Sequence, residues 1–328
     1  KSKGQFYTPS EVSRVMALVL GINEDVTSSS TTVYDPTCGS GSLLLKVGDA
    51  AKGDVTLYGQ ELDTATAALA QMNMILHNNP TAQILQGNTL SNPKFMEKGS
   101  LKTFDYVVSN PPFSDKRWSN GLSPDQDEFE RFQSYGTPPD KQGDYAYMLH
   151  IIRSLKSNGK AAVILPHGVL FRGNAEETIR KNILTRGYIK AIIGLPANLF
   201  YGTGIPACII VLDKSQAAGR DGIFMIDASE GFMKDGPKNR LHEKDVRRIV
   251  DAYQQGNDIS GYARFVPMAE VLEQDHNLNL PRYIASNKVE DIQDIDAHLN
   301  GGIPQTDIDG LGDYWQEFTN LSKVILSP

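Results

Sequence analysis

Short apolar runs alternate along the chain with segments whose apolar residues recur at helical spacing. The helical segments include 64–77, 144–155 and 175–184. When strands alternate with helices in this way, the strands usually run parallel and helices cover both faces of the sheet. We therefore predict an α/β fold with a doubly wound, mostly parallel, seven-stranded sheet. The seven predicted strands are 32–34, 55–58, 83–85, 106–109, 161–165, 191–194 and 208–212.

The pattern changes after residue 212. A further apolar run spans 222–226, and a charged candidate helix spans 242–253. From residue 271 onward the chain is acidic, with candidate helices at 286–299 and 314–325. We therefore predict a main domain over 1–270 and a C-terminal helical appendage over 271–328 that serves for docking.

A turn of small residues joins the first predicted strand to the helix after it. Residues 35–42 read Asp-Pro-Thr-Cys-Gly-Ser-Gly-Ser, and the two glycines let a ligand approach the main chain closely. Dinucleotide-binding folds use such a turn for pyrophosphate. The carboxylate of Asp35 repels phosphate, however, and suits a cationic amino group or a hydroxyl. A glycine turn alone is more often an ordinary strand-to-helix connection.

Two further polar positions favour a nucleoside site. Glu61 lies just past residues 55–58, at the carboxyl end of the second predicted strand and twenty residues after Gly41, where α/β folds place an acid for ribose hydroxyls. Asn88 follows the third strand and can place an amide against an adenine ring. Together with Asp35, these residues predict a site for a nucleoside that carries a cationic amino-acid end. S-adenosylmethionine has that chemistry.

The fourth predicted strand is followed by Asn110-Pro111-Pro112-Phe113. Two successive prolines remove backbone donors and stiffen the chain, so that carbonyl groups can accept hydrogen bonds. The side-chain oxygen of Asn110 and the backbone oxygen of Pro111 can face one planar NH2 group, and Phe113 offers a ring for a base to stack on. Such acceptors stabilise the charge that develops on an amine during methyl transfer. The segment therefore predicts a site that methylates an exocyclic amine.

Composition narrows the class of protein. The 328 residues are 40% hydrophobic and 22% charged, which is typical of globular domains. The sequence has no apolar run of about eighteen residues and no signal-peptide core, so we expect a cytoplasmic protein without a membrane span. Cys38 and Cys208 lie in unrelated contexts, and we expect neither a disulfide nor a metal site. The net charge of −7 argues against a protein that holds DNA over its whole surface.

At this point the motifs resemble a known family. Residues 35–41 and 110–113 are similar to the cofactor and catalytic motifs of N6-adenine DNA methyltransferases. Residues 4–9, Gly-Gln-Phe-Tyr-Thr-Pro, resemble the motif that closes over the methionine part of the cofactor, and their N-terminal position gives the order of the gamma class. Within that class the chain resembles modification subunits of type I restriction-modification systems. Residues 166–173, 195–196, 201–206 and 277–284 support this likeness, which spans residues 4–284.

The resemblance implies a Rossmann-like methyltransferase fold, in which 1–270 is the catalytic domain, and S-adenosylmethionine as the cofactor. It implies methylation of a flipped-out adenine at N6 in DNA. The implied partners are DNA, a specificity subunit that reads the sequence, a second modification subunit and a restriction subunit, with no membrane. Such subunits normally have an N-terminal helical domain, which we expect before Lys1.

The resemblance also assigns roles to individual residues. The catalytic candidates are Asn110, Pro111, Pro112 and Phe113. The cofactor candidates come from the N-terminal motif, the glycine turn and the ends of the next two strands. They are Gln5, Tyr7, Thr8, Pro9, Asp35, Thr37, Cys38, Gly39, Ser40, Gly41, Ser42, Glu61, Leu62, Asn88, Thr89 and Leu90. Many relatives carry aspartate in place of Asn88, but an amide oxygen also accepts a hydrogen bond from an adenine amine.

Two alternatives stay open at the level of the sequence. An adenine in RNA or a glutamine side chain in a protein presents the same planar NH2 group, although Phe113 favours a nucleobase. The other alternative is a cofactor-binding scaffold for a specificity subunit. An intact Asn110–Phe113 segment favours an active enzyme over a scaffold.

Overall fold

The structure, a computed structural model, describes residues 8–23, 25–52, 55–284, 303 and 308. The chain divides into two units, 1–285 and 286–328. The last described part of the first unit packs into its core, because Val271, Leu278 and Leu280 are buried there. The candidate helices at 286–299 and 314–325 lie outside the described residues, so the helical appendage stays a prediction.

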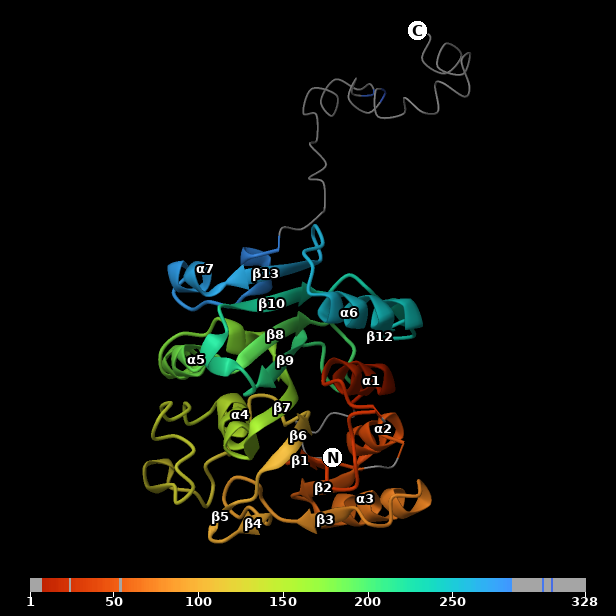
Figure 1. Ribbon diagram of the computed structural model, residues 1–328, viewed down its shortest axis with the longest axis vertical. Helices are drawn as coiled ribbons and strands as arrows, with labels where there is room; N and C mark the ends of the chain where they lie inside the picture. The colour runs from red at the N-terminus through yellow and green to blue at the C-terminus, as the bar shows by residue number, and fades with distance from the viewer. Residues whose placement is uncertain (1–7, 24, 53–54, 285–302, 304–307, 309–328) are drawn as a thin grey trace. The chain divides into compact units, whose positions relative to one another are not determined.

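A nine-stranded sheet forms the centre of the first unit (Figure 1). Its strands are β1 (Thr32–Asp35), β2 (Thr56–Glu61), β3 (Gln83–Gln86), β6 (Phe104–Ser109), β7 (Leu155–Pro166), β8 (Ile189–Gly194), β9 (Ala207–Asp213), β10 (Gly222–Asp227) and β13 (Ala263–Pro267). Their order across the sheet is β13-β10-β8-β9-β7-β6-β1-β2-β3. Strand β9 is antiparallel to both neighbours and β13 is antiparallel to β10, whereas the other neighbours are parallel. Outside this sheet, two hairpins pair β4 (Met96–Glu97) with β5 (Ser100–Leu101) and β11 (Met233–Asp235) with β12 (Lys238–Arg240).

The predicted doubly wound, mostly parallel sheet is confirmed, but it has nine strands and not seven. Each of the seven predicted runs forms a strand, and β10 and β13 extend the sheet beyond β8. The apolar run at 222–226 is β10, and all of its residues are buried. Strand β13 lies at the edge of the sheet and buries only Ala263 and Val266 fully. An edge strand with so few buried positions leaves a weak signal in the sequence.

Helices cover both faces of the sheet, as predicted (Figure 1). One face carries α1 (Ser10–Val19), α2 (Ser42–Ala50), α3 (Thr64–Leu76) and α6 (Glu243–Gln255), and the other carries α4 (Asp144–Arg153), α5 (Ala175–Thr185) and α7 (Met268–Glu273). Successive side chains of a strand point to opposite faces, so each strand contributes to two cores. In β9, Ile209 and Val211 belong to the first core, and Ile210 and Leu212 belong to the second. Within the described ranges, no helix has the length and apolar character needed to cross a membrane.

The long connection between β6 and α4 is packed against the second core. Trp118 and Phe132 are buried in it, with ring centroids 5.7 Å apart. Arg131 is also buried and pairs with Asp127 through Nε to Oδ2 at 2.9 Å and Nη2 to Oδ1 at 2.6 Å. The same Nη2 donates to the backbone oxygen of Leu90, 2.8 Å away, in the turn after β3. This ion pair therefore ties the connection to the side of the sheet where β3 ends.

We expect the Asp127→Ala variant to lower the free energy of unfolding by about 3–5 kcal/mol, because it leaves a guanidinium buried without its counter-charge. Chemical denaturation measures the effect. The matched control is Glu130→Ala in the same connection. The Oε2 atom of Glu130 lies 3.4 Å from Nη2 of Arg153, and both side chains are at least half exposed. That change should cost less than about 1 kcal/mol. Equal losses in the two variants would contradict a structural role for the buried pair.

Candidate functional site

A cavity of about 340 Å³ opens at the carboxyl ends of β1, β2, β3 and β6. These strands are neighbours in the sheet, and the loops that follow them converge on one place. Ligands of open α/β sheets bind at such an edge, and the volume lies in the usual range for small-molecule sites. The lining residues are Pro36, Thr37, Glu61, Leu62, Asp63, Gly87, Asn88, Thr89, Asn110, Pro112, Asp115, Arg117, Asn120 and Tyr147.

The glycine turn after β1 packs tightly on α3. Gly41 has a φ of +81°, and a Cβ atom added there would lie 2.5 Å from Cε of Met74. The side-chain amide of Asn73 donates to the backbone oxygen of Ser40 at 2.9 Å. Only glycine combines that backbone conformation with so close an approach to a helix. The glycine therefore lets the turn pack against α3, which holds in place Pro36 and Thr37, the residues of this turn that line the cavity.

Glu61 is held in place by the backbone on both sides of its carboxylate. Its Oε2 accepts from the N–H of Gly39 at 3.0 Å, and its Oε1 accepts from the N–H of Asp63 at 2.9 Å. A carboxylate has about four acceptor sites, so two remain for other donors. Glu61 lines the cavity and is nearly buried. The arrangement suits hydroxyl groups of a ligand, which donate to a carboxylate that is already oriented.

Asp35 lies at the start of the same turn and is 2% exposed. Its Oδ1 accepts from the N–H of Thr37 at 2.9 Å. Burial raises the pKa of Asp35 to about 7, although the hydrogen bond from Thr37 opposes the shift and the nearby charge of Glu61 adds to it. A cation bound beside it would favour the ionised form. Glu61 lines the cavity and suits ribose hydroxyls, whereas Asp35 lies outside the lining, next to Pro36 and Thr37, which line it.

The segment after β6 brings the predicted amine-holding residues to the same cavity. Asn110 and Pro112 line it, whereas Pro111 is buried. The Nδ2 of Asn110 donates to Oγ1 of Thr8 at 3.0 Å. This contact uses the amide nitrogen, so Oδ1 is the atom that serves as an acceptor. Phe113 is 8% exposed, and its ring meets that of Phe200 edge to face at 5.9 Å.

The candidate residues take three positions in the structure. Those that line the cavity are Thr37, Glu61, Leu62, Asn88, Thr89, Asn110 and Pro112. Those that are described but do not line the cavity are Thr8, Pro9, Asp35, Cys38, Gly39, Ser40, Gly41, Ser42, Leu90, Pro111 and Phe113. Gln5 and Tyr7 lie outside the described residues.

Asn88 and Thr89 stabilise the turn after β3. The Oδ1 of Asn88 accepts from the N–H groups of Leu90 at 2.9 Å and Ser91 at 3.1 Å. The hydroxyl of Thr89 donates to the backbone oxygen of Pro36 and so joins this turn to the glycine turn. The oxygen of Asn88, which we expected to accept from an adenine amine, already has two donors in the backbone, so its Nδ2 is the better group to face a ligand.

Cys38 is a structural residue of the turn. It is 5% exposed, and burial raises the pKa of its thiol well above the ordinary value. The protonated thiol is a poor nucleophile. Cys38 is therefore suited to packing in the turn and not to nucleophilic attack.

Sequence reasoning missed several residues of the cavity wall. Asp115, Arg117 and Asn120 come from the connection after Phe113, and Tyr147 comes from α4. The hydroxyl of Tyr147 donates to Oδ2 of Asp115 at 3.1 Å. The only signal was that the polar connection directly follows the amine-holding segment. Nothing in the pattern of α4 distinguishes Tyr147 from the buried residues around it.

Comparisons with known proteins show which family the sequence resembles. The sequence profile of the N-6 DNA Methylase family matches residues 1–292. The chain is 34% identical over 316 residues to the type I restriction enzyme MpnII methylase subunit of Mycoplasma pneumoniae, which covers 93% of this chain and 57% of that protein. It is 36% identical over 311 residues to the MjaVII methylase subunit of Methanocaldococcus jannaschii, covering 90% of this chain and 51% of that protein. The predicted likeness to type I modification subunits is thus confirmed.

A solved structure is also similar in fold and in sequence. The type I restriction-modification system methyltransferase subunit from Streptococcus thermophilus superimposes with a TM-score of 0.80 and is 38% identical in sequence. The match covers 87% of this chain and 60% of that one. The chain therefore spans between half and three-fifths of the length of these relatives.

Proposed function

Because the chain belongs to the N-6 DNA methylase family, we propose that it transfers a methyl group from S-adenosylmethionine to the N6 amine of adenine in DNA. We further propose that it acts in the cytoplasm as the modification subunit of a type I restriction-modification complex. The observation that carries the proposal is the shared cavity: Glu61 and Asn88 line the same space as Asn110 and Pro112. A nucleoside cofactor and a planar amine would therefore meet in one place.

Each cofactor residue is assigned to the part of the cofactor that its side-chain chemistry suits. In the proposal, Asp35 accepts from the amino group of the cofactor, and Glu61 accepts from the ribose hydroxyls. Asn88 faces the adenine with its Nδ2, which can donate to a ring nitrogen. Leu62, which lines the cavity and is 62% exposed, offers an apolar surface to the adenine ring. These assignments match each donor or acceptor of the ligand with an oriented group of the protein.

The amine-holding segment acts by position and not by acid-base chemistry. Bound S-adenosylmethionine supplies a methyl group that already has a good leaving group. The protein has to hold the amine nitrogen in line with that methyl group and accept a hydrogen bond from each of its two N–H groups. The Oδ1 of Asn110 takes one, with the amide oriented by Thr8, and the backbone oxygen of Pro111 takes the other. Phe113 supports the flipped-out base.

The pKa of Asp35 leads to a pH-dependent affinity for the cofactor. Below pH 7 the carboxyl is mostly protonated and cannot pair with an ammonium group, whereas above pH 7 it is ionised. Affinity for S-adenosylmethionine should therefore rise about fivefold to tenfold between pH 6 and pH 7.5 and then level off. Calorimetric titration at several pH values measures this. The Asp35→Asn variant should bind weakly with little pH dependence, and a flat profile in the unaltered protein would rule out Asp35 as the partner of the amino group.

DNA recognition is assigned to a partner in this proposal. The net charge of −7 disfavours tight binding of DNA by this chain alone, since phosphate contacts need concentrated basic residues. The partner proposed is a specificity subunit that reads the sequence, in a complex that includes a second modification subunit and a restriction subunit.

The test measures transfer of radiolabelled methyl from S-adenosylmethionine, with and without a co-expressed specificity subunit, followed by nucleoside analysis. N6-methyladenine in DNA that appears only with the partner supports both the reaction and the assigned recognition. Label in RNA or in glutamine side chains would overturn the substrate. Tight, sequence-specific DNA binding by the isolated chain would contradict the role of the partner.

A further inference from the structure

The residue directly after the amine-holding segment has an unusual backbone. Ser114 follows Phe113 and has a φ of +50°, in the left-handed region that residues with a side chain rarely adopt. Such a conformation persists when the surrounding structure holds it, and it often occurs at functional sites. The contacts of Ser114 therefore determine the direction that the chain takes after Asn110–Phe113.

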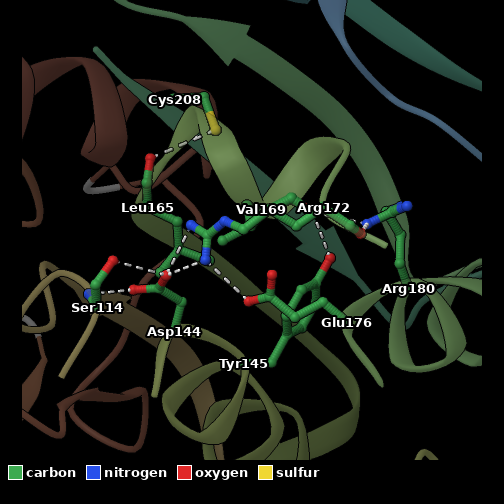
Figure 2. Close-up of polar contacts among 9 residues, drawn as sticks. All are labelled: Ser114, Asp144, Tyr145, Leu165, Val169, Arg172, Glu176, Arg180 and Cys208. Carbon is green, nitrogen blue, oxygen red and sulfur yellow. Dashed lines mark hydrogen bonds and ion pairs between the residues drawn. The ribbon is translucent and has the colours of Figure 1, made fainter. Parts of the chain in front are cut away.

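A buried carboxylate holds Ser114 in this conformation. The N–H of Ser114 donates to Oδ1 of Asp144 at 2.7 Å, and its hydroxyl lies 3.5 Å from Oδ2 (Figure 2). Asp144 is the first residue of α4 and is fully buried. A carboxylate at the start of a helix is favoured by the helix dipole. The contact links the exit of the amine-holding segment to a helix that is fixed in the second core.

Asp115, the next residue in the chain, is also bound to the beginning of α4. The backbone oxygen of Asp115 accepts from the N–H of Gly143 at 3.1 Å, and its side chain accepts from the hydroxyl of Tyr147. A Cβ atom added at Gly143 would lie 2.6 Å from Cβ of Trp118. The connection therefore approaches the start of α4 as closely as a glycine allows. Strand β6 fixes the other end of the segment at Ser109.

Arg172 supplies the counter-charge for Asp144. Its Nη1 and Nη2 lie 3.2 Å and 3.1 Å from Oδ2 of Asp144, and Nη1 also donates to Oε1 of Glu176 at 3.1 Å (Figure 2). A Cβ atom added at Gly168 would lie 2.4 Å from the guanidinium, so a glycine there leaves room for it. Both Gly168 and Arg172 belong to the 166–173 segment, for which the cofactor site provides no role. In Figure 2 the guanidinium lies between the two carboxylates.

We propose that Asp144 is a positioning residue for methyl transfer. Its carboxylate, held by Arg172, fixes the backbone at Ser114 and thereby sets the place of Asn110 and Pro111 beside the cofactor. The inference that Asp144 serves methyl transfer rests on the proposed function. The contact between Asp144 and Ser114 does not depend on it. Glu176 shares Arg172 but has no contact with Ser114 among the described residues, and it provides the matched control.

The first test compares rates of methyl transfer in the full-length protein co-expressed with its specificity subunit. Asp144→Ala should lower kcat by about a hundredfold, which is the loss expected from misplacing a reacting group by about 1 Å. The dissociation constant for S-adenosylmethionine should change by less than about threefold, because Asp144 does not line the cavity. Asp144→Asn keeps the size and one acceptor oxygen, so it should lose about tenfold in kcat and also covers the case in which the alanine variant fails to fold. Glu176→Gln should keep kcat within about threefold.

The second test does not depend on DNA. Hydrogen-deuterium exchange across residues 110–118 should be slow in the unaltered protein and faster in Asp144→Ala, but not in Glu176→Gln. If exchange responds in this way while the unaltered protein methylates no DNA, the proposed function fails and the contact stands. If Asp144 variants lose no more activity than Glu176→Gln, or if exchange is unchanged, Asp144 is not a positioning residue.

Discussion

Asn110→Ala is expected to lower kcat for methyl transfer by at least about 10²–10³-fold, the range seen when one preorganised polar group of a transition-state site is removed. The variant loses the acceptor that withdraws the amine lone pair from the ring and orients the nitrogen. The cofactor should still bind with an unchanged dissociation constant, because Asp35 and Glu61 are untouched. Rapid-quench measurement of one turnover on DNA separates the chemical step from binding.

A matched control is Asn79→Ala, which removes an amide in the connection between α3 and β3, where Nδ2 donates to the backbone oxygen of His77. That variant should keep full activity. Full activity in Asn110→Ala would exclude the two-acceptor mechanism, whether or not the dissociation constant for the cofactor changes. A rise in the dissociation constant for S-adenosylmethionine with kcat intact would instead assign Asn110 to cofactor binding.

The second large effect is expected at Glu61. Glu61→Ala removes a carboxylate that is oriented by the N–H groups of Gly39 and Asp63 and faces the cavity. Two lost hydrogen bonds to a charged group, at about 1.5 kcal/mol each, correspond to a rise of about a hundredfold in the dissociation constant for S-adenosylmethionine. Glu61→Gln keeps the shape of the side chain and should lose about tenfold. Calorimetric titration measures both.

Because Glu61 also holds the glycine turn, a loss of binding has two physical sources. Thermal unfolding without cofactor distinguishes them, since a collapsed turn lowers the melting temperature and a lost ligand contact does not. Glu97→Ala, an exposed carboxylate in the β4–β5 hairpin, controls for a general change in charge. Unchanged cofactor affinity in Glu61→Ala would remove the ribose assignment.

The local features of the fold could be predicted from the sequence. The strands and the helices between them follow from apolar spacing, because side chains repeat every two residues in a strand and every 3.6 in a helix. The glycine turn at 35–42 and the Asn110–Phe113 segment each lie directly after a strand, so their position at the carboxyl edge of the sheet could also be predicted. Of the two added strands, β10 was visible as the apolar run at 222–226 but was not assigned to the sheet, whereas β13 left little signal because it is short and half-exposed at the edge.

The full set of residues in the site could not be predicted in this way, because it depends on contacts between residues far apart in the chain. Thr8 contacts Asn110, Asp144 contacts Ser114, and Tyr147 joins the cavity wall from the first turn of α4. The spacing of residues in the sequence does not indicate any of these contacts. A polar residue that is buried in a helix cannot be told from its neighbours in the sequence until its partner in the fold is known.

The sequence by itself therefore determined the elements, the glycine turn and the amine-holding segment, because these depend on interactions between residues close in the chain. The tertiary structure alone decided which strands became neighbours and which side chains face the cavity. Strand order places the ends of β1, β2, β3 and β6 together, and α4 then supplies Asp144 and Tyr147. The physical reason is that hydrogen bonds and ion pairs between distant residues form only after the two cores have packed, and only that packing brings the partners within 3 Å or so.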